Sequence, residues 1–221
     1  MNMNDYRNLD RFFKGLRKEY SVSELHEQDM KDNPFEQFAL WFETAAQDKS
    51  SRVNSMTLCT SARSGQSCGR VVLLKGFSEE GFVFYTNWES RKAKEIEENP
   101  KVALVFYWPE LERQVVIEGK AHKLTAREAD DYFNSRPRFA QIAAWTSAQS
   151  VPIESRQALE RKFEQTEKKF ENQPLVRPLF WGGYCVSGDG FEFWQGRRDR
   201  LNDRVQYVYI KNSWQKKRLQ P

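Results

Sequence analysis

Two short apolar runs separated by a turn constrain the fold of this chain more than any other feature. The runs are Val71–Leu74 and Phe82–Tyr85, and the segment Gly76–Gly81 that joins them is rich in Gly and Glu. Apolar runs of this length, bounded by turn residues, are typical of buried strands. The pattern predicts two antiparallel strands that form a hairpin.

Cations flank both predicted strands. Arg70 and Lys75 lie on either side of the first strand, and Arg91 and Lys92 follow the second. Because Arg70 and Lys75 are five residues apart, a regular strand would turn them to opposite faces. They are therefore expected to contact different groups, unless a bulge brings them together.

A short helix is predicted after this hairpin. Ser90 resembles an N-cap, and Arg91–Glu98 has the pattern of a helix that Asn99 and Pro100 end. Two cations in the first turn oppose the helix dipole, which favours anions there by about 0.3–1 kcal/mol per charge. A bound anion would offset this cost, because backbone N–H groups and both side chains would converge on it. A solvated basic helix end is the alternative.

Charged residues are intermixed along the 221-residue chain. The 35 basic and 31 acidic residues leave a formal net charge of +4, unlike the basic face of a nucleic-acid-binding protein. No apolar run approaches the roughly 18 residues of a membrane span, and the first residues lack a signal-peptide core. Three cysteines without a C-x-x-C motif favour free thiols in a reducing compartment. We therefore expect a cytoplasmic protein that binds neither nucleic acid nor a membrane.

The remaining apolar runs indicate a mainly β fold with inserted helices (α+β), built as an antiparallel β-barrel flanked by helices. Residues 34–221 are expected to form one domain, preceded by a flexible arm over residues 1–33. Gly188–Gly190 and Lys211–Ser213 are predicted hairpin turns. The other predicted strands are Met56–Ser61, Val102–Trp108, Arg113–Gly119, Tyr184–Ser187, Phe191–Gln195, Val205–Ile210 and Trp214–Leu219. The other predicted helices are Phe35–Gln47, Ala126–Ser135 (after a capping box formed by Thr125 and Glu128), Phe139–Trp145 and Glu154–Asn172.

Two further clusters carry side chains suited to ligands. Tyr132 and Arg136 are four residues apart and share a helix face, and beside Lys75 they would suit a phosphate group. An exposed helix end is the alternative. The segment Phe193–Arg204 carries four Arg and two Asp and is either a ligand-binding or a flexible surface loop, with Trp194 able to stack on a planar ring. The common nucleotide-binding loops are absent, and only two histidines argue against a His-ligated metal or a Ser–His triad.

Several of these segments together resemble the pyridoxine (pyridoxamine) 5′-phosphate oxidase family, in order and spacing from about residue 34 to the end. The family implies an FMN-binding split barrel that works as a homodimer with FMN at the subunit interface. It implies oxidation of pyridoxine 5′-phosphate or pyridoxamine 5′-phosphate at C4′, with O₂ as the final acceptor and pyridoxal 5′-phosphate as the product. The matching segments are Arg70–Lys75, Phe84–Asn87, Ser90–Lys92, Leu111–Val115, Tyr132–Pro137, Gln149–Ser150, Trp181–Gly183, Glu192–Gly196 and Arg218–Leu219.

The resemblance also assigns roles to individual positions. Arg200 matches a residue beside the substrate ring, and an N-terminal segment that includes Arg17, Lys18 and Tyr20 would cover the bound substrate. The positions that match the family's FMN contacts are Arg70, Lys75, Tyr85, Thr86, Arg91, Lys92, Gln114, Gln149, Ser150, Trp194 and Arg204. The positions that match its substrate-phosphate contacts are Lys75, Tyr132 and Arg136.

Two positions depart from the family pattern. Asn202 replaces a histidine that lies at the substrate, and Asn cannot titrate near neutral pH. Ala140 replaces a serine that contacts the substrate phosphate, which would cost about 1 kcal/mol for the lost contact. The expected function is an FMN-dependent oxidase. The alternative is a flavin-binding paralogue with little turnover that carries vitamin B6 phosphates or binds a partner.

Overall fold

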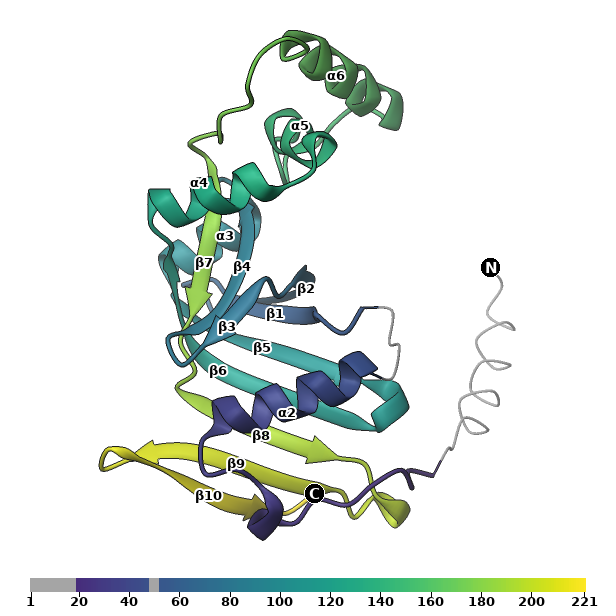
Figure 1. Cartoon of the computed structure of the whole chain (residues 1–221), viewed down its shortest axis with the longest axis vertical. Coiled ribbons are helices and arrows are strands. Elements are labelled where there is room, and N and C mark those ends of the chain that lie inside the picture. Colours follow the sequence, from purple (N-terminus) through teal and green to yellow (C-terminus); the bar gives the residue numbers. More distant parts are fainter. Residues whose placement is uncertain (1–18, 48–51) are drawn as a thin grey trace.

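The computed structural model describes residues 19–47 and 52–221, which form one curled antiparallel sheet with helices packed on it (Figure 1). The mainly β fold with inserted helices predicted above is confirmed. One path through the sheet runs β10-β9-β8-β6-β5-β1-β2, and a second group joins β3 to β4, β4 to β7 and β7 to β6. The strands are β1 Ser55–Ser61, β2 Ser67–Leu73, β3 Gly76–Ser78, β4 Gly81–Asn87, β5 Lys101–Trp108, β6 Arg113–Lys123, β7 Trp181–Val186, β8 Gly190–Gln195, β9 Asp203–Ile210 and β10 Ser213–Leu219.

Strand β6 is the point where the barrel splits. Residues Arg113–Glu118 of β6 pair with β8, whereas Ala121–Lys123 pair with β7. Gly119 lies between these two stretches, and a Cβ atom there would come within 1.7 Å of the Ser187 carbonyl oxygen. Only glycine therefore allows the close approach at which the two groups of strands diverge.

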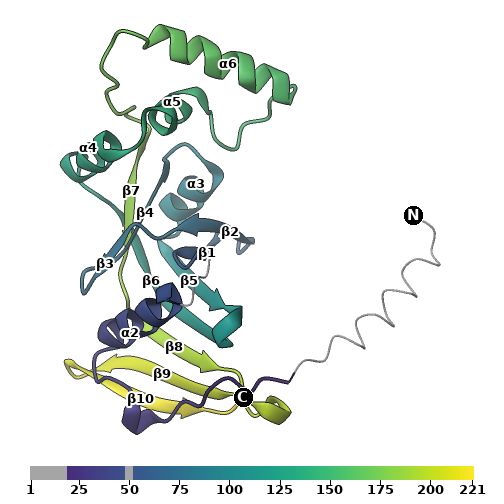
Figure 2. The same cartoon turned by 45° about the vertical axis from the view of Figure 1, so that its right-hand side comes forward.

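The helices cover the sheet at different levels (Figures 1 and 2). Helix α2 crosses the face of the barrel, and α4, α5 and α6 lie beyond the end formed by β4 and β7. Strands β9 and β10 form the opposite end of the molecule. The helices are α2 Pro34–Gln47, α3 Arg91–Glu98, α4 Ala126–Ser135, α5 Arg138–Thr146 and α6 Arg156–Lys169, and the 3₁₀ turns are η1 Glu27–Asp29, η2 Pro109–Leu111 and η3 Arg198–Arg200.

Aromatic side chains fill the barrel beneath α2. Phe38 is fully buried, and its ring lies 4.9–5.0 Å from those of Phe77, Phe82 and Phe106, with steeply inclined planes. Such edge-to-face pairs add to the stabilisation that burial supplies. A second, smaller core under α4 and α5 centres on Phe133 and Trp181. This second core holds α4 and α5 against β7.

Two predicted hairpins are wrong. The run Val71–Leu74 does not pair with β4, because β2 pairs with β1 and the chain then crosses to the other group of strands. The short strand β3, within the predicted turn, pairs with β4 instead. Likewise β7 and β8 do not pair around Gly188–Gly190, since β7 pairs with β4 and β6 while β8 pairs with β6 and β9. The hairpin of β9 and β10 and the capping box at Thr125 are confirmed.

The described part of the predicted arm packs on the barrel. Leu25 and Met30 are buried and belong to the main core, and the Tyr207 hydroxyl donates to the Lys31 carbonyl at 2.7 Å. The predicted boundary between arm and domain at residue 33 stays a prediction. Arg17 and Lys18 lie outside the described residues. Within the described ranges, no helix combines the length and apolar character needed to cross a membrane.

Candidate functional site

A cavity of about 580 Å³ opens between β4, α4 and α5. Its volume lies within the usual range for small-molecule sites. Lys75, Tyr132 and Arg136, predicted to lie together, all line it, and so does Ala140. Lys75 follows the end of β2 rather than extending it, and its Nζ atom lies 6.0 Å from the Tyr132 ring centroid. The other lining residues are Val71, Val72, Leu73, Tyr85, Thr86, Asn87, Lys92, Pro137, Ala143, Ala144, Ser147, Gln149 and Trp181.

Arg136 brings a partly buried guanidinium to the lining of this cavity. Its guanidinium carbon lies 4.6 Å from the Trp181 ring centroid, a cation–π distance that holds the group in place. One terminal nitrogen is buried and has no hydrogen-bond partner among the described residues. Burial lowers the pKa of Arg136, although a guanidinium stays charged at any physiological pH. A buried charged donor without a partner favours an anionic ligand in the cavity.

Flat aromatic rings form one wall of the cavity. The Tyr85 and Tyr132 rings stack at 3.8 Å between centroids with 14° between their planes, and Trp181 lies nearly parallel to both. Burial, reinforced by Tyr132 and two nearby carboxylates, raises the pKa of Tyr85 to about 12. The Tyr85 hydroxyl therefore stays protonated near neutral pH and can act as a hydrogen-bond donor.

The start of α3 forms a second cationic centre at the edge of the same cavity. Ser90 is the N-cap residue by position, but its side chain makes no capping hydrogen bond. The Arg91 backbone N–H donates to the Ser150 hydroxyl at 3.2 Å, and the Lys92 ammonium donates to Gln149 Oε1 at 2.8 Å. Lys92 also donates to the Thr86 hydroxyl at 3.2 Å. Burial, with a contribution from the charge of Arg70, lowers the pKa of Lys92 to about 8.

A buried carboxylate lies behind these cations. Glu95 accepts from Arg91 Nε at 2.7 Å, from an Arg70 terminal nitrogen at 2.8 Å and from the Thr60 hydroxyl. Burial would raise the pKa of Glu95, but the three hydrogen bonds outweigh it and the pKa is lowered. Arg70 thus faces α3 while Lys75 faces the cavity. These two cations serve different places, as their five-residue spacing suggested.

The other predicted cofactor positions form a row on β6, β8 and β9. Trp194 is paired with Gln114 on one side and with Arg204 on the other. The Arg204 guanidinium makes two hydrogen bonds of 2.9 Å to the Glu192 carboxylate, which raises the pKa of Arg204. Tyr20 places its ring edge-on to Trp194, with 5.5 Å between centroids.

Arg200 and Asn202 lie on the loop that follows this row. Arg200 is exposed and, like Asp199 before it, has a positive φ of about 60° (60° and 57°). The Asn202 side-chain oxygen accepts from the Arg197 backbone N–H at 3.0 Å. Positive φ angles are unfavourable for Asp199 and Arg200. The hydrogen bond from Arg197 to Asn202 spans these two residues and helps to stabilise the loop in this conformation. Asn202 therefore contributes a contact within the loop, at the position that the family pattern assigns to the substrate.

The predicted residues thus fall into two groups within one chain. The first group, which we call the cavity group, surrounds the cavity and the start of α3: Arg70, Lys75, Tyr85, Thr86, Arg91, Lys92, Tyr132, Arg136, Ala140, Gln149 and Ser150. The second, the loop group, lies around β8 and β9: Tyr20, Gln114, Trp194, Arg200, Asn202 and Arg204. Among residues 19–47 and 52–221, no hydrogen bond joins one group to the other.

The sequence did not single out Glu95 or Glu112 as site residues. Glu95 stands in a helix among other acids and resembles a solvated residue, yet its side chain is only 7% exposed. Glu112 follows a 3₁₀ turn and is also buried. The pairing of Glu95 with Arg91 follows the local i,i+4 spacing of a helix, whereas its pairing with Arg70 depends on long-range packing.

Comparisons with known proteins cover nearly the whole chain. Residues 42–170 match the family described as pyridoxamine 5′-phosphate oxidase, and residues 181–221 match the pyridoxine 5′-phosphate oxidase C-terminal dimerisation region. Relatives named pyridoxine/pyridoxamine 5′-phosphate oxidase are 50% identical in Rubrobacter xylanophilus (94% of this chain, 95% of that protein) and in Crocosphaera subtropica (93% and 98%).

A solved structure confirms the fold. PhzG from Burkholderia lata, in complex with tetrahydrophenazine-1-carboxylic acid, is 28% identical and superposes with a TM-score of 0.84 over 91% of this chain and 100% of that one. The mainly antiparallel split barrel is shared with it. By its family match and its relatives, the chain belongs to the pyridoxamine 5′-phosphate oxidase family and is an oxidoreductase.

Proposed function

We propose that this protein oxidises pyridoxine 5′-phosphate or pyridoxamine 5′-phosphate to pyridoxal 5′-phosphate, with FMN as the cofactor and O₂ as the acceptor. The observation that carries the proposal is a pair of separate cationic centres on one cavity, Lys92 at the start of α3 and Arg136 with Lys75 between α4 and β2. Both FMN and the substrate carry a phosphate group. Two centres suit two phosphates that lie at a distance from each other.

The residues at the start of α3 fit the FMN phosphate. The helix terminus supplies backbone N–H groups and a positive dipole end, and no acid lies in its first turn. Thr86, Arg91, Lys92, Gln149 and Ser150 surround this terminus with donors. We assign them to the FMN phosphate, and Arg70 to the support of the same centre through Glu95.

The residues at Arg136 fit the substrate phosphate. Arg136 would donate from its guanidinium group, with Lys75 and Tyr132 completing the centre. Ala140 lines the same cavity and supplies no hydroxyl. The substrate phosphate therefore has one contact fewer than the family pattern provides.

Bound FMN would supply the hydride-acceptor chemistry that oxidation at C4′ of the substrate requires. The chain itself orients and shields the reacting groups, which is the usual division of labour in cofactor enzymes. Trp194, Gln114 and Arg204 are assigned to FMN, and Arg200 and Asn202 to the substrate ring. Tyr85 remains a neutral donor on the cavity wall because of its raised pKa.

We also propose that the active enzyme is a homodimer with FMN at the interface. The cavity group and the loop group lie apart in one chain, so one copy can offer its cavity to the loop of another. The match of residues 181–221 to a dimerisation region supports this arrangement. Val71 and Leu73 line the cavity and are 68% and 42% exposed, which is unusual for apolar side chains unless a partner covers them.

A cytoplasmic location is part of the proposal. Cys59, Cys68 and Cys185 all carry free thiols, which suits a reducing compartment.

The test is to purify the protein, measure bound flavin, and follow the formation of pyridoxal 5′-phosphate and hydrogen peroxide from each substrate. Bound FMN with turnover would support the oxidase. Flavin-containing protein without turnover would refute it and favour a flavin-binding paralogue. Protein that lacks flavin and fails to bind added FMN would refute the cofactor assignment.

A further inference from the structure

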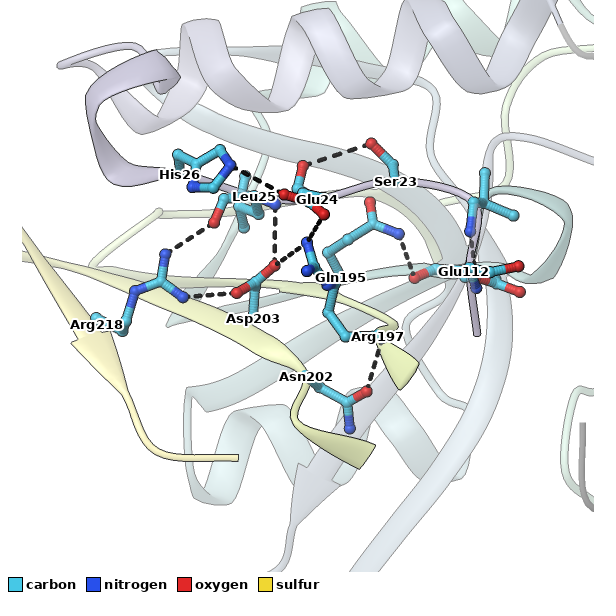
Figure 3. A network of polar contacts seen from close by, with 12 residues as sticks. Ser23, Glu24, Leu25, His26, Glu112, Gln195, Arg197, Asn202, Asp203 and Arg218 are labelled. Carbon is cyan, nitrogen blue, oxygen red and sulfur yellow. Dashed lines mark hydrogen bonds and ion pairs between the residues drawn. The ribbon is translucent and has the colours of Figure 1, made fainter. Parts of the chain in front are cut away.

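The segment Tyr20–Glu27 is fastened to the barrel by carboxylates that the proposed chemistry does not use (Figure 3). Glu112 Oε2 accepts the backbone N–H groups of both Ser21 and Val22, at 2.8 and 3.0 Å. Asp203 Oδ2 accepts the Leu25 backbone N–H at 3.0 Å. The backbone of this segment therefore binds to side chains of the barrel rather than to a neighbouring strand.

Glu112 has three features that mark it as more than a surface acid. It is only 3% exposed, and its φ of 53° is in the left-handed region that favours glycine. Its carbonyl accepts the Gly196 N–H at 2.8 Å and the Gln195 side chain at 3.3 Å. Strained residues of this kind persist where the surroundings require them, often at functional sites. Glu112 joins the start of β6, the end of β8 and the N-terminal segment.

The contact that Glu112 supports is that of Tyr20 with Trp194. Tyr20 directly precedes the two residues whose N–H groups Glu112 binds, and its ring meets Trp194 edge-on. Gly196 leaves the space for this ring, because a Cβ atom there would lie 2.7 Å from it. A displaced segment would therefore remove Tyr20 from the loop group.

A separate clamp holds the following residues. Arg218 makes two hydrogen bonds to the Glu27 carboxylate, at 2.6 and 2.8 Å, and donates to the Leu25 carbonyl at 2.8 Å. It also donates to Asp203 at 2.6 Å. Loss of the Glu112 contact should therefore release Ser21 and Val22 while Leu25 and Glu27 stay fastened.

We propose that Glu112 is a positioning residue that holds Tyr20 against Trp194 and so closes the substrate side of the site. An ionised carboxylate that accepts two backbone N–H groups forms stronger hydrogen bonds than a neutral acceptor. The effect on turnover rests on the proposed function, whereas the placement of the segment does not. One measurement can therefore test the placement of the segment, and a second can test its effect on turnover.

The first measurement is amide hydrogen exchange of the full-length protein without substrate. In Glu112→Ala we expect Ser21 and Val22 to exchange at least about tenfold faster, as the loss of a charge-assisted hydrogen bond implies, with Leu25 within about twofold of wild type. Glu112→Gln, which keeps an acceptor oxygen, should recover part of the protection. Glu110→Gln, an exposed acid in the same turn, is the control and should change neither. Unchanged exchange at Ser21 and Val22 in both Glu112 variants overturns the proposal.

The second measurement is steady-state kinetics with pyridoxine 5′-phosphate. Glu112→Ala should raise KM about tenfold and leave kcat within about threefold, because substrate closure is weakened while Glu112 itself is not among the residues assigned to FMN. A fall in kcat with unchanged KM overturns the closing role. If Glu112→Ala does not fold, Glu112→Gln tests the closing role instead, and its KM should rise by a smaller factor. A wild-type protein without turnover would refute the proposed function, and the exchange data would still decide the placement of the segment.

Discussion

The Lys92 ammonium donates to Gln149 Oε1 at 2.8 Å, which ties the first turn of α3 to the segment after α5. Gln149 also accepts from the Thr86 hydroxyl at 3.0 Å, so one amide oxygen joins a strand, a helix and a loop. Two consecutive elements, β4 and α3, thus meet a segment that is distant in sequence at the centre assigned to the FMN phosphate. The state of the Lys92 ammonium then controls how strongly this centre attracts an anion.

FMN affinity should fall as pH rises through about 8. The pKa of Lys92 is lowered to about 8 from 10.5, chiefly by burial, so the ammonium is charged below pH 8 and neutral above it. The FMN phosphate is already a dianion there, and bound phosphate raises the pKa of Lys92 again. Between the pKa of Lys92 in the free protein and its higher pKa in the FMN complex, the affinity for FMN should drop up to about tenfold per pH unit. In this range, FMN binding is accompanied by the uptake of a proton. Titration of the apoprotein with FMN from pH 6.5 to 10 measures this.

The matched control is Lys92→Arg. A guanidinium keeps its charge across this range, so its FMN affinity should be nearly independent of pH up to 10. A pH profile shared by both proteins would contradict the assignment of the titrating group to Lys92.

Arg136→Ala should weaken substrate binding without changing FMN binding. The guanidinium lines the cavity and one of its nitrogens has no hydrogen-bond partner among residues 19–47 and 52–221, so its loss removes charge-assisted hydrogen bonds to the substrate phosphate. We expect KM to rise about 10–100-fold, the equivalent of about 1.5–3 kcal/mol, and the FMN dissociation constant to stay within about threefold. Arg138→Ala is the control, because Arg138 is exposed and does not line the cavity. Equal effects of the two substitutions would contradict the assignment.

The limits of prediction from sequence are visible at particular residues. The capping box of Thr125 and Glu128 and the bounds of α3 follow from contacts within one turn, and both were predicted correctly. The partner of β2 was predicted wrongly, because an apolar run indicates a strand but does not determine which strand lies beside it. Val71 faces outward on this strand, which the run of apolar residues concealed.

In the candidate site, too, local relationships were easier to predict than long-range contacts. Tyr132 and Arg136 were predicted to share a helix face beside Lys75; in the structure Arg136 is the C-cap of α4 with an extended backbone, and all three side chains line the same cavity. The pairing of Glu95 with Arg70 spans 25 residues and depends on how α3 packs against β1 and β2. The i,i+4 spacing within α3 indicates Glu95 as the partner of Arg91, but no local rule predicts that the same carboxylate also pairs with Arg70.

Ala140→Ser should tighten substrate binding. The new hydroxyl would enter the cavity next to Arg136 and offer one more donor to the substrate phosphate. A gain of about 1 kcal/mol corresponds to a roughly fivefold lower KM. Ala143→Ser tests whether any hydroxyl in the cavity suffices, since Ala143 also lines it one turn further along α5. A KM that is unchanged in Ala140→Ser would show that the phosphate does not approach this position.

Asn202 should prove important for the loop as well as for the substrate. Asn202→Ala removes the bond to the Arg197 N–H and should destabilise the protein by about 1 kcal/mol, measured by urea unfolding. Asn202→His supplies a group that titrates near pH 6.5, and we expect faster turnover with a new pH dependence around that value. An unchanged rate and pH profile in Asn202→His would show that the position tolerates Asn without loss.

Glu27 should titrate far below an ordinary glutamate. Hydrogen bonds from Arg218, with a further one from its own backbone, lower the pKa of Glu27 from 4.5 to about 2. Because the folded pKa is lowered, the contact stabilises the segment above pH 4.5 and loses this effect as pH falls toward 2. Carbon NMR of the Glu27 carboxyl measures the pKa, and Arg218→Gln should return it toward 4.5. A Glu27 pKa near 4.5 in the wild-type protein would mean that the clamp of Arg218 on Glu27 does not persist in solution.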